Sequence, residues 1–239
     1  MVRRQAPVRG PDEVLVRPRR VGICGTDYHI YEGKHPFLNY PRVMGHELAV
    51  EIVEAPDGSG FRAGDIAVVN PYIFCGSCIA CRRGKPNCCT RIEVLGVHRD
   101  GGMTELLVLP EGNLVPAEGL SLEACAAVEF LAIGAHAVRR SNAVAGDRAL
   151  VVGAGPIGLG VALFAARAGA EVTIMDREAE RLESATLIVK DTRTILAGPD
   201  MPERVSAMTG GDGFDLCPSS DALAQTGVLI SGESCSSLG

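Results

Sequence analysis

The residues with the clearest chemistry are cysteines in one short loop. Cys75, Cys78 and Cys81 are each separated by two residues, and Cys88 and Cys89 follow as two candidates for a fourth ligand. Two-residue gaps let the backbone turn successive thiolates onto one ion, and Zn2+ accepts four sulfurs in a closed, structural site. The alternative is a set of disulfides, but the first residues of the chain are polar and lack the apolar core of an export signal. The loop therefore predicts a structural zinc.

A second set of possible metal ligands is divided between two segments. Cys24 lies in one, and His46 and Glu47 are adjacent in the other. Fewer than four protein ligands leave an open position on zinc, where an alcohol can lose its proton near neutral pH and then give up hydride. In isolation, Cys24 would be read as a small buried hydrophobe and His46 as a hydrogen-bonded core histidine. Their occurrence with Glu47 and the four-cysteine loop favours a catalytic zinc instead.

Three polar residues beside Cys24 could assist this chemistry. Asp27 is placed to accept the free ring N–H of His46, which would fix the tautomer of the imidazole. Thr26 could take the substrate proton, and His29 could pass it to solvent. The structural alternatives are a turn residue, a strand hydroxyl and a surface side chain, respectively. The neighbouring metal ligands favour the catalytic roles.

Glu129 is a carboxylate within an otherwise apolar segment, residues 127–136. Burying a carboxylate is costly unless it is paired, bound to metal or protonated. Glu129 is therefore a candidate zinc ligand or a partner of a water molecule on the zinc. An exposed acid near the start of a helix is an equal alternative. The residues leave open whether Glu47 or Glu129 is the third ligand.

A glycine-rich turn follows an apolar strand and opens a helix. Gly153, Gly155 and Gly158 occur there as Gly-x-Gly-x-x-Gly, which in this setting is typical of dinucleotide binding. The first glycine permits a tight turn, the second lets the backbone approach a pyrophosphate, and the third allows close helix–strand packing. Pro156 and Ile157 begin the helix, whose N-terminus would hold the phosphates. A turn in an unrelated α/β protein is the structural alternative.

The choice of dinucleotide depends on the end of the next strand. Asp176 lies there, where a carboxylate would bind the ribose hydroxyls of the adenosine and repel a 2′-phosphate. The sequence therefore predicts NAD in preference to NADP. Arg177 is a possible phosphate-binding group at the same corner, or a solvent-facing side chain.

Composition excludes several classes of protein. The 239 residues are 46% hydrophobic and 22% charged, with a net charge of -6 and a pI near 5.4. An acidic chain of this kind argues against a nucleic-acid groove or an anionic membrane surface. The apolar run 149–166 carries glycines and a proline, so strand, turn and helix explain it better than a membrane span. Nine cysteines fit the reducing cytoplasm.

The hydrophobic pattern divides the chain in two. Residues 13–112 contain short apolar or alternating runs between Gly, Pro and Asp breaks, which predict a mostly β half. A helical period runs from 120 to about 140. A strand at 148–153, a helix at 155–168 and a strand at 171–176 then form one βαβ unit. A short strand within 190–196 and a helix at 201–208 follow, whereas 215–239 shows no clear period. We predict domains at 1–140 and 141–239.

Together these motifs resemble the zinc-containing medium-chain dehydrogenases of the alcohol dehydrogenase superfamily, in the branch of sorbitol, threonine and sugar-acid dehydrogenases. The resemblance covers about residues 13–176. It implies an α/β protein with a GroES-like, β-rich catalytic domain followed by a partial Rossmann domain. It also implies Cys24, His46 and Glu47 at the catalytic zinc, Glu129 on the zinc or its water, and Cys89 as the fourth structural ligand.

The resemblance further implies a reaction: oxidation of a secondary alcohol of a polyol or sugar acid to a ketone, with hydride transfer to NAD. Arg42 or Lys34 could bind a substrate carboxylate. The partners are then small molecules, and relatives of full length are expected to be homo-oligomers.

Relative to the family, the chain is expected to lack the first strands of the catalytic domain and a long C-terminal part, and therefore to be marginally stable. The alternative function is accordingly a truncated, inactive chain that only binds zinc and adenine nucleotide. A zinc-ribbon module would explain the cysteine loop alone and leave the other motifs without a role.

Overall fold

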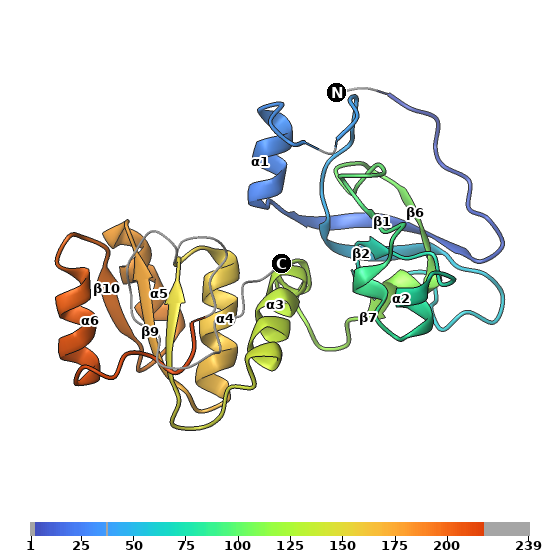
Figure 1. The fold of residues 1–239 in the computed structure, drawn as a ribbon. Coiled ribbons are helices and arrows are strands. Elements are labelled where there is room, and N and C mark those ends of the chain that lie inside the picture. The colour runs from blue at the N-terminus through green and yellow to red at the C-terminus, as the bar shows by residue number, and fades with distance from the viewer. Residues whose placement is uncertain (1–2, 37, 218–239) are drawn as a thin grey trace. The chain divides into compact units, whose positions relative to one another are not determined.

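The computed structural model describes residues 3–36 and 38–217, so the segment without a clear period lies mostly outside the described residues (Figure 1). The chain divides into two compact units, Met1–Glu129 and Phe130–Gly239. The predicted domain boundary at residue 140 stays a prediction, and one helix, α3 (Leu122–Ser141), contributes to both units.

The first unit is built on a five-stranded sheet in the order β6-β1-β2-β3-β7. All neighbouring strands are antiparallel. The strands are β1 (Glu13–Gly22), β2 (Glu47–Glu54), β3 (Ile66–Val69), β6 (Leu107–Pro110) and β7 (Leu114–Pro116). At the start of β1, Val14 and Val16 are buried, whereas Glu13 and Leu15 beside them are partly exposed. This alternation is expected for a half-buried strand. The predicted β-rich half is confirmed.

Strand β2 has apolar side chains on both faces. Leu48, Val50 and Ile52 belong to the main core on one face. Ala49 faces the other way and packs with Cys125 and Ala126 of α3. The sheet therefore places the first half of α3 against the strand that begins with a candidate metal ligand.

Smaller elements carry the remaining candidate residues of this unit. They are α1 (Gly25–Tyr31), β4 (Tyr72–Ile73), α2 (Ile79–Arg82), η1 (Pro86–Cys88), β5 (Glu93–Val94) and η2 (Glu111–Asn113). Strands β4 and β5 pair antiparallel on either side of the cysteine-rich loop. This hairpin-like pairing closes the loop at its base.

The second unit contains a parallel sheet in the order β10-β9-β8. Its elements are β8 (Arg148–Val152), α4 (Pro156–Arg167), β9 (Glu171–Asp176), α5 (Ala179–Ile188), β10 (Arg193–Leu196) and α6 (Met201–Thr209). Alternate strand residues face two cores: Val151 and Ile174 pack with α4 and α5, and Leu150, Met175 and Ile195 pack with α6. Both faces of the sheet are covered, as parallel sheets require. The expected βαβ order is confirmed.

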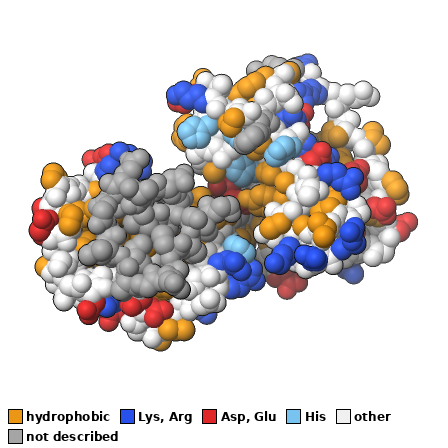
Figure 2. All heavy atoms as spheres, viewed as in Figure 1, with side chains coloured by type: hydrophobic (Ala, Val, Ile, Leu, Met, Phe, Trp, Pro, Cys, Tyr) orange, Lys and Arg blue, Asp and Glu red, His pale blue; other side chains and the backbone are white. Residues whose placement is uncertain are grey.

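The apolar run 149–166 forms β8, a turn and most of α4. Among the described residues, no helix combines the length and the hydropathy that crossing a membrane requires. On the face drawn in Figure 2, acidic and basic side chains are interspersed. Ion pairs at the surface, such as Arg19 with Glu51 and Arg20 with Glu123, are at least partly exposed, and each is worth little stability.

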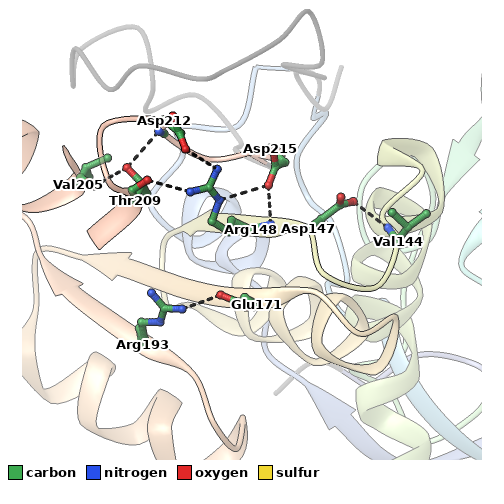
Figure 3. Close-up of polar contacts among 10 residues, drawn as sticks. Val144, Asp147, Arg148, Glu171, Arg193, Val205, Thr209, Asp212 and Asp215 are labelled. Atoms are coloured by element: carbon green, nitrogen blue, oxygen red, sulfur yellow. Dashed lines mark hydrogen bonds and ion pairs between the residues drawn. The ribbon is translucent and has the colours of Figure 1, made fainter. Parts of the chain in front are cut away.

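The segment after α6 returns to the edge of β8. Ala149 and Leu216 form an isolated parallel bridge. The Leu216 N–H donates to the Arg148 carbonyl at 3.2 Å, and the Leu150 N–H donates to the Leu216 carbonyl at 2.9 Å. Side chains strengthen this contact (Figure 3). The Arg148 guanidinium donates to the Thr209 carbonyl at 2.9 Å and lies 3.5 Å from Asp215, which also accepts the Arg148 backbone N–H. Arg148 therefore fastens the end of α6 to the sheet.

We expect Arg148→Ala to lower the free energy of unfolding by about 1 to 2 kcal/mol, because it leaves the Thr209 carbonyl and Asp215 without this donor. Urea denaturation measures the change. The control is Arg193→Ala: Arg193 pairs with Glu171 where strands β10 and β9 begin (Figure 3), with half of its side chain accessible. Loss of that pair should cost under about 1 kcal/mol. Equal losses in both variants would contradict the role of Arg148.

Candidate metal and cofactor sites

The structure brings four thiols of the cysteine loop together. Ligand atoms of Cys75, Cys78, Cys81 and Cys89 all lie within 4.8 Å of one another, and the sulfurs of Cys78 and Cys81 are 3.4 Å apart. Sulfurs on one tetrahedral zinc are separated by about 3.8 Å, given Zn–S bonds of about 2.3 Å. The four residues therefore fit a structural zinc with small adjustments. Cys88 is exposed and is not in this group.

Backbone amides in the loop point at the sulfurs. The Cys78 N–H donates to Cys75 and the Arg91 N–H donates to Cys89, both at 3.4 Å. Hydrogen bonds from the Ser77 and Cys78 amides lower the pKa of Cys75 to about 5. Such donors stabilise thiolate, the form that binds metal.

A second group joins the two segments singled out in the sequence. Ligand atoms of Cys24, His46 and Glu47 lie within 4.8 Å of one another. Cys24 immediately precedes helix α1, whereas His46 precedes β2 and Glu47 begins it. Gly22, the last residue of β1, pairs with Glu47 across the sheet. The antiparallel pairing of β1 with β2 thus brings the two segments together.

Asp27 fixes the backbone of this group. Its carboxylate accepts the Cys24 N–H at 2.9 Å and the Gly45 N–H at 3.3 Å. The distance from Asp27 to Nδ1 of His46 is 4.0 Å, beyond a hydrogen bond, so the expected bond to the imidazole is not formed in this structure. Asp27 holds the two ligand-bearing loops together instead.

The charges of the second group favour a cation. Burial lowers the pKa of His46, but the neighbouring Cys24, Asp27 and Glu129 outweigh it and raise that pKa overall. Burial also raises the pKa of Glu47, and Glu129 raises it further. Nδ1 of His46 is buried and has no hydrogen-bond partner among the described residues. Acidic groups crowded around one imidazole with an unused nitrogen fit a divalent metal ion.

Glu129 lies close to this group without belonging to it. Its carboxylate, 7% exposed, accepts a hydrogen bond of 2.8 Å from the hydroxyl of Tyr72. Burial and the charge of Glu129 raise the pKa of Tyr72, which keeps the phenol protonated and able to donate. Glu129 is therefore buried and paired, and the exposed alternative does not describe it.

The two residues expected to move a proton lie on α1. A hydrogen bond from His46 and others from Thr26 outweigh burial and lower the pKa of Cys24. Thr26 is half-buried, and His29 is exposed one helical turn further on. Residues three apart lie on the same face of a helix. Thr26 is therefore the nearer of the two to the metal-binding group along α1, and His29 is the one exposed to solvent.

The glycine-rich turn joins β8 to α4 in the second unit. Gly153 has φ +100°, which favours glycine, and Gly155 precedes the first helical residue, Pro156. An added Cβ on Gly158 would lie 1.9 Å from the Gly153 carbonyl oxygen, whereas Gly155 has open space around its Cα. Ile157 is partly exposed at the helix start. The turn thus leaves room above Gly155 for a phosphate at the helix N-terminus.

Asp176 supports the same turn from the end of β9. Its carboxylate accepts the Ala154 N–H at 2.7 Å and the Glu178 N–H at 2.9 Å. Burial raises its pKa, but these amides and Arg181 outweigh burial and lower it. Each carboxylate oxygen can accept a second hydrogen bond, so Asp176 could bind a ribose hydroxyl as well. Arg177 is exposed beside it.

Comparisons with known proteins agree with this geometry. The alcohol dehydrogenase GroES-like domain matches residues 10–119, and the pyridine nucleotide-disulphide oxidoreductase model matches 111–194, which includes the glycine-rich turn. The crystal structure of alcohol dehydrogenase TADH from Thermus sp. ATN1 is 31% identical, with a TM-score of 0.83 over 96% of this chain and 72% of that one. The chain belongs to the zinc-containing medium-chain alcohol dehydrogenase family. The predicted family and fold class are confirmed.

Two curated dehydrogenases are similar to this chain over most of its length. L-galactonate-5-dehydrogenase of Escherichia coli K12 is 42% identical over 209 residues, which are 87% of this chain and 62% of that protein. L-threonine 3-dehydrogenase of Pyrococcus horikoshii is 34% identical over 90% of this chain and 64% of its own length. The chain thus spans less than two thirds of these relatives.

One residue of the site was missed in the sequence. Tyr72 lies three positions before Cys75, on the strand that leads into the cysteine loop, and contacts Glu129 from 57 positions away. A tyrosine beside a metal-binding loop was the available signal. Nothing local indicated its partner, because that contact depends on the packing of α3.

The four-thiol group allows a paired test. Cys89→Ser should remove about one zinc ion per chain, because three remaining thiolates leave the tetrahedral site incomplete. Cys88→Ser should retain the metal, since Cys88 lies outside the group. Elemental analysis of both purified variants measures the difference. Zinc loss from the Cys88 variant alone would show that the ligand is misassigned.

Asp176 predicts a pH dependence of stability. Its folded pKa is lowered, so its contribution is present above the unfolded pKa of about 3.9 and is lost as pH falls through the folded value. Asp176→Asn leaves one amide without its acceptor and should cost about 1 to 3 kcal/mol at pH 7. The difference from wild type should shrink below about pH 4 in urea denaturation. A difference that stays constant into acid, or an equal effect of exposed Asp57→Asn, would contradict this role.

Proposed function

We propose that this chain carries the metal-binding and NAD-binding residues of a dehydrogenase that oxidises a secondary alcohol of a polyol or sugar acid to a ketone. The observation that carries the proposal is the group of Cys24, His46 and Glu47, which fits a metal ion, in a chain that also forms a dinucleotide-binding turn. The four-thiol loop would hold a second, structural zinc. The 42% identity to an L-galactonate dehydrogenase favours a sugar acid as substrate.

The residues of the first unit have separate roles in this proposal. Cys24, His46 and Glu47 hold the metal, which when bound supplies a Lewis acid that stabilises negative charge on an alcohol oxygen. The Thr26 hydroxyl accepts the proton of the substrate alcohol while it donates its own proton toward His29, which would release a proton to solvent. Asp27 keeps Cys24 and His46 in position through the backbone bonds described above.

The second unit would bind the hydride acceptor. Gly153, Gly155 and Gly158 form the turn, and the start of α4 at Pro156 and Ile157 faces the pyrophosphate. Asp176 accepts the ribose hydroxyls and disfavours the 2′-phosphate of NADP, so NAD is the proposed cofactor. Similar solved structures include one complexed with NADH and one bound to NADP. Exposed Arg177 is the residue that could still admit a phosphate.

The proposed site of action is the cytoplasm, because its reducing conditions keep metal-binding cysteines such as those of the four-thiol loop as thiols. The substrate carboxylate would need a cation. Arg42 contacts Asp100 at 3.4 Å and lines a cavity of about 360 Å³ with Arg91 and His98. Lys34 pairs with Glu32. Both cations are paired with carboxylates that do not belong to the metal-binding group, and the proposed site does not include them.

The residues of the two sites also allow a second function, in which the chain holds its ligands and does not perform the reaction. It would then bind zinc and adenine nucleotide without turnover. The two functions share every residue named above and differ only in the chemical step. They therefore predict the same metal content and different activity.

The test measures zinc per chain by elemental analysis beside NAD reduction with L-galactonate, other hexonates, sorbitol and L-threonine. About two zinc ions with turnover of one of these substrates supports the dehydrogenase. About two zinc ions and NAD binding without turnover supports the binding function. A chain that retains only the zinc of the four-thiol loop would overturn the proposed ligand set.

A further inference from the structure

Tyr72 has no role in the proposed reaction, yet its surroundings hold it firmly. Its N–H donates to the Asn70 side chain at 3.1 Å. The buried amide of Asn113 donates to the carbonyls of Asn70 at 2.8 Å and Tyr72 at 3.1 Å. One asparagine side chain thus bridges both carbonyls, and the backbone that carries the phenol is fixed at three points.

The other end of Tyr72 reaches Glu129. The hydroxyl donates to one carboxylate oxygen at 2.8 Å, and Glu129 is 7% exposed on α3. A buried carboxylate must be paired with a donor or a cation. Within the described residues, the phenol of Tyr72 is the side-chain donor for which the structure gives a hydrogen bond to Glu129.

Glu129 also lies near the metal-binding group. The negative charge of Glu129 raises the pKa of both His46 and Glu47. Glu129 is nevertheless not one of the three residues whose ligand atoms converge. Two carboxylates, Glu47 and Glu129, are therefore available to one ion, and only Glu47 is in place. The hydrogen bond from Tyr72 is the contact that distinguishes them.

We propose that Tyr72 is a positioning residue that holds Glu129 beside the Cys24–His46–Glu47 group and outside it, which leaves Glu47 as the third metal ligand. The inference rests on the proposed function, because it concerns the same metal site. The phenol of Tyr72, on strand β4 before the cysteine loop, thereby determines which of the two glutamates binds the metal. Without the hydroxyl, Glu129 loses its donor, and a metal ion held by Cys24, His46 and Glu47 would supply a charge that stabilises the carboxylate.

Tyr72→Phe tests this with the full chain loaded with Co2+, whose visible absorption reports coordination number. Glu129 should join the metal in the variant, so the d–d bands should weaken as coordination rises. Release of cobalt to a chelator should slow by about tenfold, a typical size for the effect of one neighbouring group on metal binding. A difference spectrum against wild type removes the unchanged contribution of the four-thiol loop. The matched control is Tyr31→Phe, which removes the same hydroxyl from a side chain that is 83% exposed.

A double variant shows whether Tyr72 acts through Glu129. In the Glu129→Gln background, adding Tyr72→Phe should change neither the spectrum nor the release rate. An unchanged spectrum in Tyr72→Phe, or the same change with and without Glu129, would overturn the inference. Circular dichroism and thermal melting confirm that each variant is folded. Cobalt spectra do not depend on turnover. A chain that shows the spectral change but no activity would therefore support the role of Tyr72 and contradict the proposed dehydrogenase function.

Discussion

Gly158→Ala is expected to destabilise the second unit by about 3 kcal/mol or more. The added methyl carbon would lie 1.9 Å from the Gly153 carbonyl oxygen and 2.9 Å from its carbon. Both are backbone atoms of the turn that joins β8 to α4, so no side chain can move aside to make room. The helix start must separate from the strand, with a drop in Tm of roughly 10 °C for a chain of this size. Thermal melting followed by circular dichroism measures it.

The matched control for Gly158 is Gly155→Ala in the same turn. Gly155 has nothing within 4 Å of an added Cβ, and its φ is -77°. The control should melt close to wild type and bind NAD more weakly, because its methyl group occupies the space proposed for the pyrophosphate. Equal melting of the two variants would contradict the packing argument. Unchanged NAD binding by Gly155→Ala would contradict the proposed cofactor site.

Gly22→Ala is expected to abolish metal binding at the second group and leave the four-thiol loop loaded. An added Cβ at Gly22 would lie 2.1 Å from a carboxylate oxygen of Glu47 and 2.8 Å from its Cβ. Opposite side chains in antiparallel strands normally keep their Cβ atoms about 4.5 to 5.5 Å apart. Glu47 must therefore leave its place beside Cys24 and His46. Zinc content should fall by about one ion per chain, and any dehydrogenase activity with it.

Gly25→Ala provides the comparison for Gly22. Gly25 begins α1 next to Cys24, and an added Cβ there meets nothing within 4 Å. Alanine is also the better helix former. This variant should keep both metals and the wild-type stability. If Gly22→Ala also retained both metals, Glu47 would not be required as a ligand, and Glu129 would become the candidate.

Local spacing was enough to predict much of this molecule. Cysteines two residues apart, and glycines at Gly-x-Gly-x-x-Gly between a strand and a helix, act through neighbouring backbone and therefore appear in the sequence. The alternation in β1 and the apolar runs of β8 and β9 predicted strands for the same reason. The family and the fold class followed from these local patterns, because several of them occur in one order.

Tertiary structure decided the contacts between distant residues. Spacing alone left Cys88 and Cys89 as equal candidates and the family resemblance favoured Cys89, which the fold of the loop brings to the other three thiols. Asp27 was assigned to the imidazole of His46, but backbone amides of the converging loops are its nearer partners.

The hydrogen bond between Tyr72 and Glu129 joins residues 57 positions apart, and Arg148 meets Asp215 across 67. Such pairs carry no local signal. They form only when strands, loops and helices pack, because burial then requires every carboxylate and amide to find a partner. The sequence by itself thus determined which residues could bind metal and nucleotide, and the packing decided which atoms meet.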